Sequence, residues 1–216
     1  MKYILILYLF STIVSASEMN KHLLKPISVF KKKKIFISLL LPIINKIDNE
    51  LNILYKSTIL DIKHSRNLYN IKRLKEEYKV DTDKKLLMAI KPHPKSIVLA
   101  QAAIESAWAT SRFFKQANNI FGLWSINKKE PRIAALEKRG KYTIWLKKFV
   151  SLEDSMRSYY KLLAKSPAYS EFRQLKMQTD DAYLLTKKLN KYSERGIEYC
   201  SQIEKLIRYN KFTKYD

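Results

Sequence analysis

The chain has 216 residues with three glycines and six prolines, a composition that favours one mainly helical domain plus an extension over a turn-rich all-β protein. Its 42 lysines and arginines outnumber 20 acids, and this formal charge of +22 suits a polyanion or an anionic matrix as partner. A single cysteine and no cysteine-histidine cluster exclude an intramolecular disulfide and the usual metal sites. We therefore expect no metal and no cofactor and, without a zinc-finger or basic-zipper motif, no nucleic-acid partner.

The first 17 residues have the layout of a secretory signal peptide. Lys2 precedes an apolar run from Tyr3 to Val14, and small residues follow at positions 15 to 17. An uncleaved membrane anchor is the alternative, because the run is short for a spanning helix and the charged region before it is minimal. Either reading places the protein in the periplasm or outside the cell.

Residues 18–80 are expected to form a helical extension. The basic cluster Lys31 to Lys34 precedes ten apolar residues, too few to cross a bilayer as a helix. The cluster suits contact with a membrane or wall surface, but the solvated start of a helix is the favoured interpretation. From Leu40, apolar residues recur at steps of three and four, which predicts a long amphipathic helix, with breaks, to about Tyr78.

Asp81 or Thr82 can cap a short helix through Ile90, and a stiff connector, residues 91–94, then leads into a central helix. That helix is predicted from Lys95 through Trp108, with His93 as a candidate cap. It is apolar nearly all round, which is typical of a helix buried in a core.

Glu105 is the one acid of the central helix, and its spacing puts it on the same face as Gln101 and Trp108. Burying an unpaired carboxylate is costly, so such a group is paired, faces a cleft, or is protonated with a raised pKa. An ion pair with Arg112 or a distant lysine would be a structural explanation. A raised pKa would suit a general acid.

After Trp124 the pattern changes to a period of two, and residues 131–149 are predicted to form a β-hairpin that turns at Arg139-Gly140. Ser151 and Asp154 have capping-box spacing and open a helix through Leu163. Further helices are expected to start at Ser166-Pro167, at Thr179 or Asp180, and at Ser193.

Three segments together resemble a known family: IESAW at Ile104 to Trp108, NNIFGLW at Asn118 to Trp124, and YSERGIEY at Tyr192 to Tyr199. They are similar to the signatures of the Bax-type glucosaminidase-domain proteins, relatives of the flagellar N-acetylglucosaminidases of glycoside hydrolase family 73. The resemblance implies a mainly α, lysozyme-like domain with a small β-hairpin lobe over residues 81–216. It also implies an endo-β-N-acetylglucosaminidase that cuts peptidoglycan glycan strands, and we expect a monomer.

By this resemblance Glu105 is the general acid, and Tyr192 is a cleft tyrosine that stabilises the transition state or the N-acetyl group of the sugar. The substrate-binding candidates lie on the central helix and in the loop after it. They are Gln101, Trp108, Asn118, Phe121, Gly122 and Trp124. Each has a structural alternative, because asparagines in turns often bond their own backbone and aromatic residues at helical spacing are usually core.

The second catalytic group is less determined. Glu137, on the predicted first strand, is a candidate for the carboxylate on the opposite wall of the cleft. Glu130 lies nearer the start of the loop, and capping explains Asp154. Without a second carboxylate, the acetamido group of the substrate could act as nucleophile.

Three other functions compete with hydrolysis by a glucosaminidase. A lytic transglycosylase also uses a single glutamate, but NNIFG stands where those enzymes usually have a Gly-Leu-Met-Gln loop. An inactive wall-binding or secretion-accessory protein would keep the cleft without chemistry. A nucleic-acid-binding module ranks last, because it leaves the export signal and the buried acid unexplained.

Overall fold

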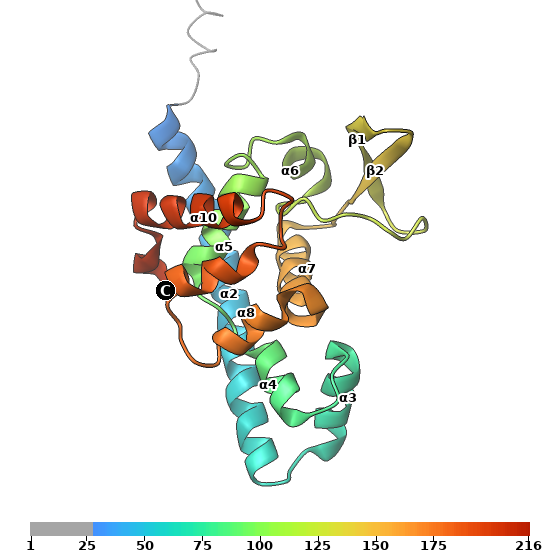
Figure 1. Cartoon of the computed structure of the whole chain (residues 1–216), viewed down its shortest axis with the longest axis vertical. Helices are drawn as coiled ribbons and strands as arrows, with labels where there is room; N and C mark the ends of the chain where they lie inside the picture. The colour runs from blue at the N-terminus through green and yellow to red at the C-terminus, as the bar shows by residue number, and fades with distance from the viewer. Residues whose placement is uncertain (1–27) are drawn as a thin grey trace, which may run out of the picture.

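Helix α5 (Lys95–Glu105) lies at the centre of the molecule (Figure 1) in the computed structural model, which describes residues 28–216. All of its side chains from Ser96 to Ala103 are buried. Helices α2 (Val29–Lys63) and α10 (Ile197–Asn210) pack against it. The helix can be buried on all sides because it is apolar nearly all round.

Short helices and one β-hairpin surround this centre. The remaining α-helices are α3 (Leu68–Tyr78), α4 (Asp83–Ile90), α6 (Arg112–Ala117), α7 (Leu152–Lys165), α8 (Ser170–Leu175) and α9 (Ala182–Thr186). The 3₁₀ helices are η1 (Pro167–Tyr169), η2 (Lys187–Leu189) and η3 (Phe212–Tyr215). Strands β1 (Arg132–Arg139) and β2 (Tyr142–Lys147) form an antiparallel pair. The predicted mainly α fold with a small hairpin lobe is therefore confirmed, whereas the signal peptide expected at residues 1–17 lies outside the described residues.

Helix α2 joins the expected extension to the core of the domain. Its buried face carries Phe36, Leu40, Ile44 and Ile47, which belong to the same hydrophobic cluster as the apolar residues of α5. The helix begins at Val29, directly before the lysine cluster, and continues through Pro42. None of the helices in residues 28–216 is long and apolar enough to cross a membrane.

The far half of α2 supports a second, smaller cluster. Buried side chains of α3 and α4, among them Leu74, Tyr78 and Leu86, pack there with Ala164 of α7. Leu54 and Ile62 of α2 cover this cluster. Figure 1 shows α3 and α4 beside this end of α2, away from the β-hairpin.

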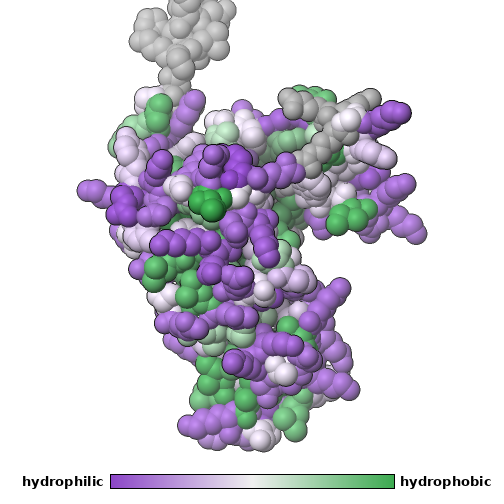
Figure 2. All heavy atoms as spheres, viewed as in Figure 1, coloured by the Kyte–Doolittle hydropathy of each residue, from purple (hydrophilic) through white to green (hydrophobic). Residues whose placement is uncertain are grey.

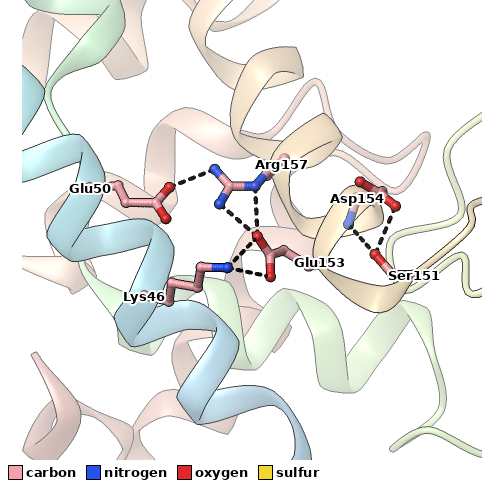
Figure 3. Close-up of polar contacts among 6 residues, drawn as sticks. All are labelled: Lys46, Glu50, Ser151, Glu153, Asp154 and Arg157. Carbon is pink, nitrogen blue, oxygen red and sulfur yellow. Dashed lines mark hydrogen bonds and ion pairs between the residues drawn. The ribbon is translucent and has the colours of Figure 1, made fainter.

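Ion pairs fix α2 against α7 (Figure 3). Lys46 Nζ lies 2.9 Å from a Glu153 oxygen, and Arg157 lies 2.7 Å from both Glu50 and Glu153. Exposed ion pairs stabilise a fold by at most about 1 kcal/mol each, so packing of the apolar faces holds the two helices together and the network sets their register.

The N-terminus of α7 is capped as predicted. Ser151 Oγ accepts a hydrogen bond from the Asp154 backbone N–H at 3.1 Å and donates one to Asp154 Oδ2 at 2.7 Å (Figure 3). Likewise, Thr82 caps α4 and Ser166 begins η1. The structural explanation of Asp154 is confirmed.

Two other predicted helix starts are wrong. Asp181, rather than Thr179 or Asp180, caps α9, with its carboxylate accepting from two backbone N–H groups. Helix α10 begins at Ile197 after Gly196, and Ser193 instead lies in the preceding turn.

His93 does not cap α5, because its ring is buried against other aromatic rings. Asp216 supplies the missing acceptor from the other end of the domain. Its carboxylate accepts from the Ser96 backbone N–H and from Ser96 Oγ, both at 2.7 Å. A carboxylate at this position also interacts favourably with the positive end of the helix dipole.

Because α2 shares the core of α5, we predict that Ile44→Ala lowers the free energy of unfolding of the whole molecule by about 2–5 kcal/mol. Ile44 is fully buried, whereas Ile53 of the same helix is 61% exposed, so Ile53→Ala is the matched control and should change it by about 0.5 kcal/mol or less. Thermal and denaturant melts should show one transition in each protein. A separate, earlier transition in Ile44→Ala would mean that α2 folds independently.

Candidate active site

A cleft with a volume of about 870 Å³ lies between α7, the loop after α6, and the turn before α10. Glu105 lines it from the end of α5. Its other walls include Phe121, Gly122, Trp124, Lys165 and Tyr192. The structure thus brings together Glu105, Tyr192 and three of the six predicted substrate-binding residues.

Helix α5 ends abruptly at Glu105. Ala107, Trp108 and Ala109 all have left-handed backbone conformations, with φ of 50°, 59° and 65°. Ser106 secures this end, because its hydroxyl donates to the Ala102 carbonyl at 2.6 Å and accepts from the Ala109 N–H at 2.8 Å. The predicted continuation of the helix to Trp108 is therefore wrong, although alanine and serine give no local signal for such a turn.

The left-handed turn directs Trp108 away from the cleft. Its ring packs edge-on against Phe36 at 5.1 Å and lies 6.3 Å from Phe212. Lys33 Nζ lies 5.0 Å from the centre of the same ring. The structure places Trp108 in the packing between α2, α5 and η3, so it is not brought to the predicted sugar-binding position.

A chain of hydrogen bonds leads from the core to the acid. Tyr199 donates to Glu105 Oε1 at 2.8 Å, and Gln101 Nε2 donates to the Tyr199 hydroxyl at 3.0 Å. Tyr159 donates to Gln101 Oε1 at 2.6 Å, and His93 Nε2 lies 3.2 Å from the Tyr159 hydroxyl. Gln101 is fully buried, so the structure places it behind the acid, bonded to Tyr199 and Tyr159, and not on the cleft wall.

The direction of this chain favours the proton on one oxygen of Glu105. With the Tyr199 hydroxyl donating to Oε1, Oε2 is the oxygen left free to carry the proton of the neutral acid. Oε2 lies beside Gly122, where an added Cβ would come within 3.7 Å of it. Gly122 has a φ of +64° and also lines the cleft.

Burial raises the pKa of Glu105, while the hydrogen bond from Tyr199 and the positive charge of Arg195 oppose this rise. The position of Glu105 in the last turn of α5 also raises its pKa, because the C-terminal end of a helix carries partial negative charge. Glu105 therefore stays neutral to a higher pH than an exposed glutamic acid does.

Tyr192 lies next to this acid, on the wall of the cleft. Its ring stacks on that of Tyr199, with centroids 5.6 Å apart and planes within 3°. Its hydroxyl donates to the Phe121 carbonyl at 3.3 Å. Burial raises the pKa of Tyr192 well above its ordinary value, so the side chain stays a neutral phenol near pH 7.

The two asparagines of the loop hold its shape. Asn118 ends α6 with a φ of 49° and donates to the Phe149 and Val150 carbonyls at 3.1 and 3.0 Å. Asn119 is buried and bridges the loop to β2 by donating to the Leu123 and Lys147 carbonyls, both at 2.9 Å. The structure gives Asn118 the structural role and does not place it on the cleft wall.

Two aromatic residues of the loop line the cleft in different ways. Phe121 is buried and stacks on Tyr159, with centroids 4.0 Å apart, so it forms part of the cleft floor. Trp124 is 56% exposed and bridges to Leu146 of β2. Trp124 is thus a largely exposed aromatic side chain at the rim of the cleft, a type of residue that can stack on a sugar.

Of the three candidates for a second carboxylate, two have other contacts in the structure. Glu130 pairs with Lys147 at 3.2 Å, and Asp154 serves as a helix cap. Glu137 lies on β1 near an irregularity in the strand pairing between Ala134 and Lys138, but its side chain is outside the described part. Among the side chains described, Glu105 is the one acid that lines the cleft.

Sequence reasoning missed Tyr199 as the partner of Glu105. Tyr199 closes the third family motif, and a buried phenol usually needs a hydrogen-bond partner, so both signals were present in the sequence. Sequence reasoning also did not single out the four lysines that line the cleft, Lys79, Lys147, Lys161 and Lys165. As for metals, no group of three or more His, Cys, Asp or Glu within residues 28–216 is arranged to hold an ion.

Comparisons with known proteins find relatives in sequence and in structure. The Glucosaminidase family model, described as mannosyl-glycoprotein endo-beta-N-acetylglucosaminidase, matches residues 84–212. Protein bax of Escherichia coli K12 is 31% identical over 112 residues, which are 49% of this chain and 39% of that protein. The chain therefore spans about two fifths of the length of this curated relative.

One solved structure shows the same fold. The catalytic domain of the autolysin Auto from Listeria monocytogenes superposes with a TM-score of 0.55 at 19% identity, covering 97% of this chain and 99% of that one. A peptidoglycan hydrolase from Sphingomonas sp. A1 gives a TM-score of 0.47 at 19% identity, covering 59% and 86%. The first likeness extends over α2 as well as the family-matched region, and it confirms the predicted fold class.

We predict that Tyr199→Phe raises the pKa of Glu105 further, because it removes a hydrogen bond that stabilises the carboxylate form. The measurement is a pH titration of the Glu105 side-chain carboxyl by carbon-13 NMR. Tyr160→Phe is the matched control, since Tyr160 is also buried but lies outside the hydrogen-bond chain, and it should leave the titration unchanged. A lower pKa in Tyr199→Phe would contradict the proton arrangement described above.

Proposed function

The chain belongs to the glucosaminidase family, and we propose that it is an exported endo-β-N-acetylglucosaminidase that hydrolyses the glycan strands of peptidoglycan. The observation that carries this proposal is the carboxyl of Glu105, which lines the cleft, is held by Tyr199 and has a raised pKa. Export rests on the signal-peptide pattern of residues 1–17. The proposal that the substrate is a cell-wall polymer is supported by the structural relative with the same fold, which is an autolysin.

In the proposed reaction Glu105 is the general acid. Its Oε2 proton moves to the glycosidic oxygen as the bond to the sugar breaks and oxocarbenium character develops. The carboxylate that remains keeps the Tyr199 hydrogen bond on Oε1 and the favourable charge of Arg195. Both interactions are stronger in the charged form, so they stabilise the product of proton transfer more than the reactant.

Tyr192 is proposed to stabilise the substrate on the side of the cleft nearest the acid. Its hydroxyl is held at the Phe121 carbonyl and, as a neutral phenol, can turn to an N-acetyl group or to the developing positive charge. Trp124 is proposed as a stacking surface and Gly122 as a point of close backbone approach to the sugar. Glu137 on β1 or the acetamido group of the substrate would supply the second catalytic group.

The charge of the cleft suits a substrate with acidic groups. Lys79, Lys147, Lys161 and Lys165 line it together with one acid, Glu105. Lys147 and Lys161 pair with acids outside the cleft lining, at 3.2 and 3.1 Å. Peptide stems of peptidoglycan carry free carboxylates, so these lysines are proposed to bind glycan strands that bear stems better than neutral strands.

Glu105→Gln should slow hydrolysis by roughly 10²- to 10⁴-fold, since it removes the general acid while keeping the size of the side chain. The assay digests purified peptidoglycan and identifies the new ends by mass spectrometry. Glu198→Gln is the matched control, because Glu198 is exposed on the first turn of α10. Equal digestion by all three proteins would refute the role of Glu105, and 1,6-anhydro ends would identify a lytic transglycosylase instead.

The pH dependence should follow the neutral form of Glu105. Because the folded pKa is raised, activity should persist above the pH at which an ordinary glutamic acid ionises, and it should fall as pH rises through the raised pKa. Tyr199→Phe should move this fall to higher pH. A profile limited only at acid pH would argue against a general acid at this position.

Digestion of peptidoglycan should weaken as salt rises, because ions screen attraction beyond about 8 Å at physiological ionic strength. A neutral chitin oligosaccharide is the control substrate, and its hydrolysis should respond much less. Lys165→Gln should reduce the difference in salt response between the two substrates. Equal salt responses for both substrates would rule out electrostatic attraction of the wall.

A further inference from the structure

The start of α2 and the end of α10 form a surface that combines lysines with exposed apolar side chains. Val29 and Phe30 are 70% and 78% exposed, and Tyr209 is 80% exposed. Lys31, Lys32 and Lys34 are exposed among them. We call these six residues the basic apolar end. The start of α2 lies at the top of the coloured ribbon in Figure 1, and hydrophilic and hydrophobic atoms lie side by side there in Figure 2.

An apolar groove with a volume of about 830 Å³ runs from this end between α2 and the C-terminal segment. Ile37, Leu41 and Tyr215 line it, and Lys34 and Lys214 stand at the same groove. Exposed apolar area of this kind is unusual on a chain of such high charge, and apolar patches rimmed by polar residues mark interaction sites.

The charge around the groove is predominantly positive. From Val29 to Lys46 the sequence contains five lysines and no acid. From Lys205 to Asp216 it contains three lysines, Lys205 included, one arginine that pairs with Glu204 at 3.2 Å, and a single acid, Asp216. That acid is already engaged with the N-terminus of α5, where it bonds Ser96 at 2.7 Å.

The surface is held in a fixed shape by Lys33. Its Nζ donates to Asn210 Oδ1 at 2.8 Å and lies 4.6 and 5.0 Å from the centres of the Tyr209 and Trp108 rings. These contacts fasten the first turns of α2 to α10. Lys31, Lys32 and Lys34 form no ion pair with another described residue, so the lysines next to Lys33 face outward on a preformed support.

We propose that the basic apolar end docks on an anionic lipid bilayer. Phe30, Val29 and Tyr209 would enter the headgroup region, while the three outward lysines face lipid phosphates. Stable attachment to a bilayer surface requires both an apolar contribution and a basic one, and this surface supplies the two together. A second copy of the chain fits less well, because a symmetric contact would bring the lysine clusters together.

The test is co-sedimentation of the full chain with vesicles of phosphatidylcholine alone or with phosphatidylglycerol added. The wild type should bind the anionic vesicles only. Combined Lys31→Gln, Lys32→Gln and Lys34→Gln should weaken this binding on the order of 100-fold, at about fivefold per lysine. Combined Lys56→Gln, Lys63→Gln and Lys72→Gln removes the same charge from exposed positions elsewhere and should have little effect.

Phe30→Ser should also weaken vesicle binding without changing peptidoglycan digestion, because it lies outside the cleft lining. Equal weakening by the two triple variants would show that net charge rather than this surface binds lipid, and would overturn the proposal. Unchanged binding by the α2 triple variant would overturn it as well. A dimer in light scattering that Phe30→Ser dissociates would overturn the proposal too. The same holds if the α2 triple variant loses binding to insoluble wall but keeps its binding to vesicles.

Discussion

The hydrogen bond from Tyr199 to Glu105 is the contact on which the site depends. It holds a carboxyl at the end of a helix whose other side chains are nearly all buried. A carboxyl left there without a partner would be expensive in both protonation states, since even the neutral acid needs hydrogen bonds. The packing of α2 and α10 on α5 therefore does more than stabilise the fold, because it fixes the distance between Glu105 and its partner.

The remaining polar groups behind the acid are neutral. Burial raises the pKa of Tyr159, Tyr192 and Tyr199 and lowers that of His93, so none of them carries charge near pH 7. The hydrogen bonds run from Tyr159 through Gln101 and Tyr199 to Glu105, so these neutral groups hold one another in place. Fixed dipoles of this kind need no rearrangement when charge develops on Glu105, and this is the main advantage of a preorganised site.

Sequence reasoning found the elements with strong periodicity and the acid that interrupts an apolar helix. It could not find contacts between residues far apart in the chain, such as Asp216 on Ser96 or Tyr199 on Glu105. It also included Gln101 and Trp108 among the substrate-binding candidates. Because α5 ends at Glu105, Trp108 leaves the helical face expected for it, and Gln101 faces the core.

The left-handed turn at Ala107, Trp108 and Ala109 also changes which substitutions the domain should tolerate. Left-handed conformations cost non-glycine residues roughly 1–2 kcal/mol each, and glycine is free of that cost. Glycine should thus be tolerated in place of Ala107 or Ala109, while valine or isoleucine should not. In a library of variants around this cleft, glycine, which usually disfavours helices, should therefore be enriched directly after α5.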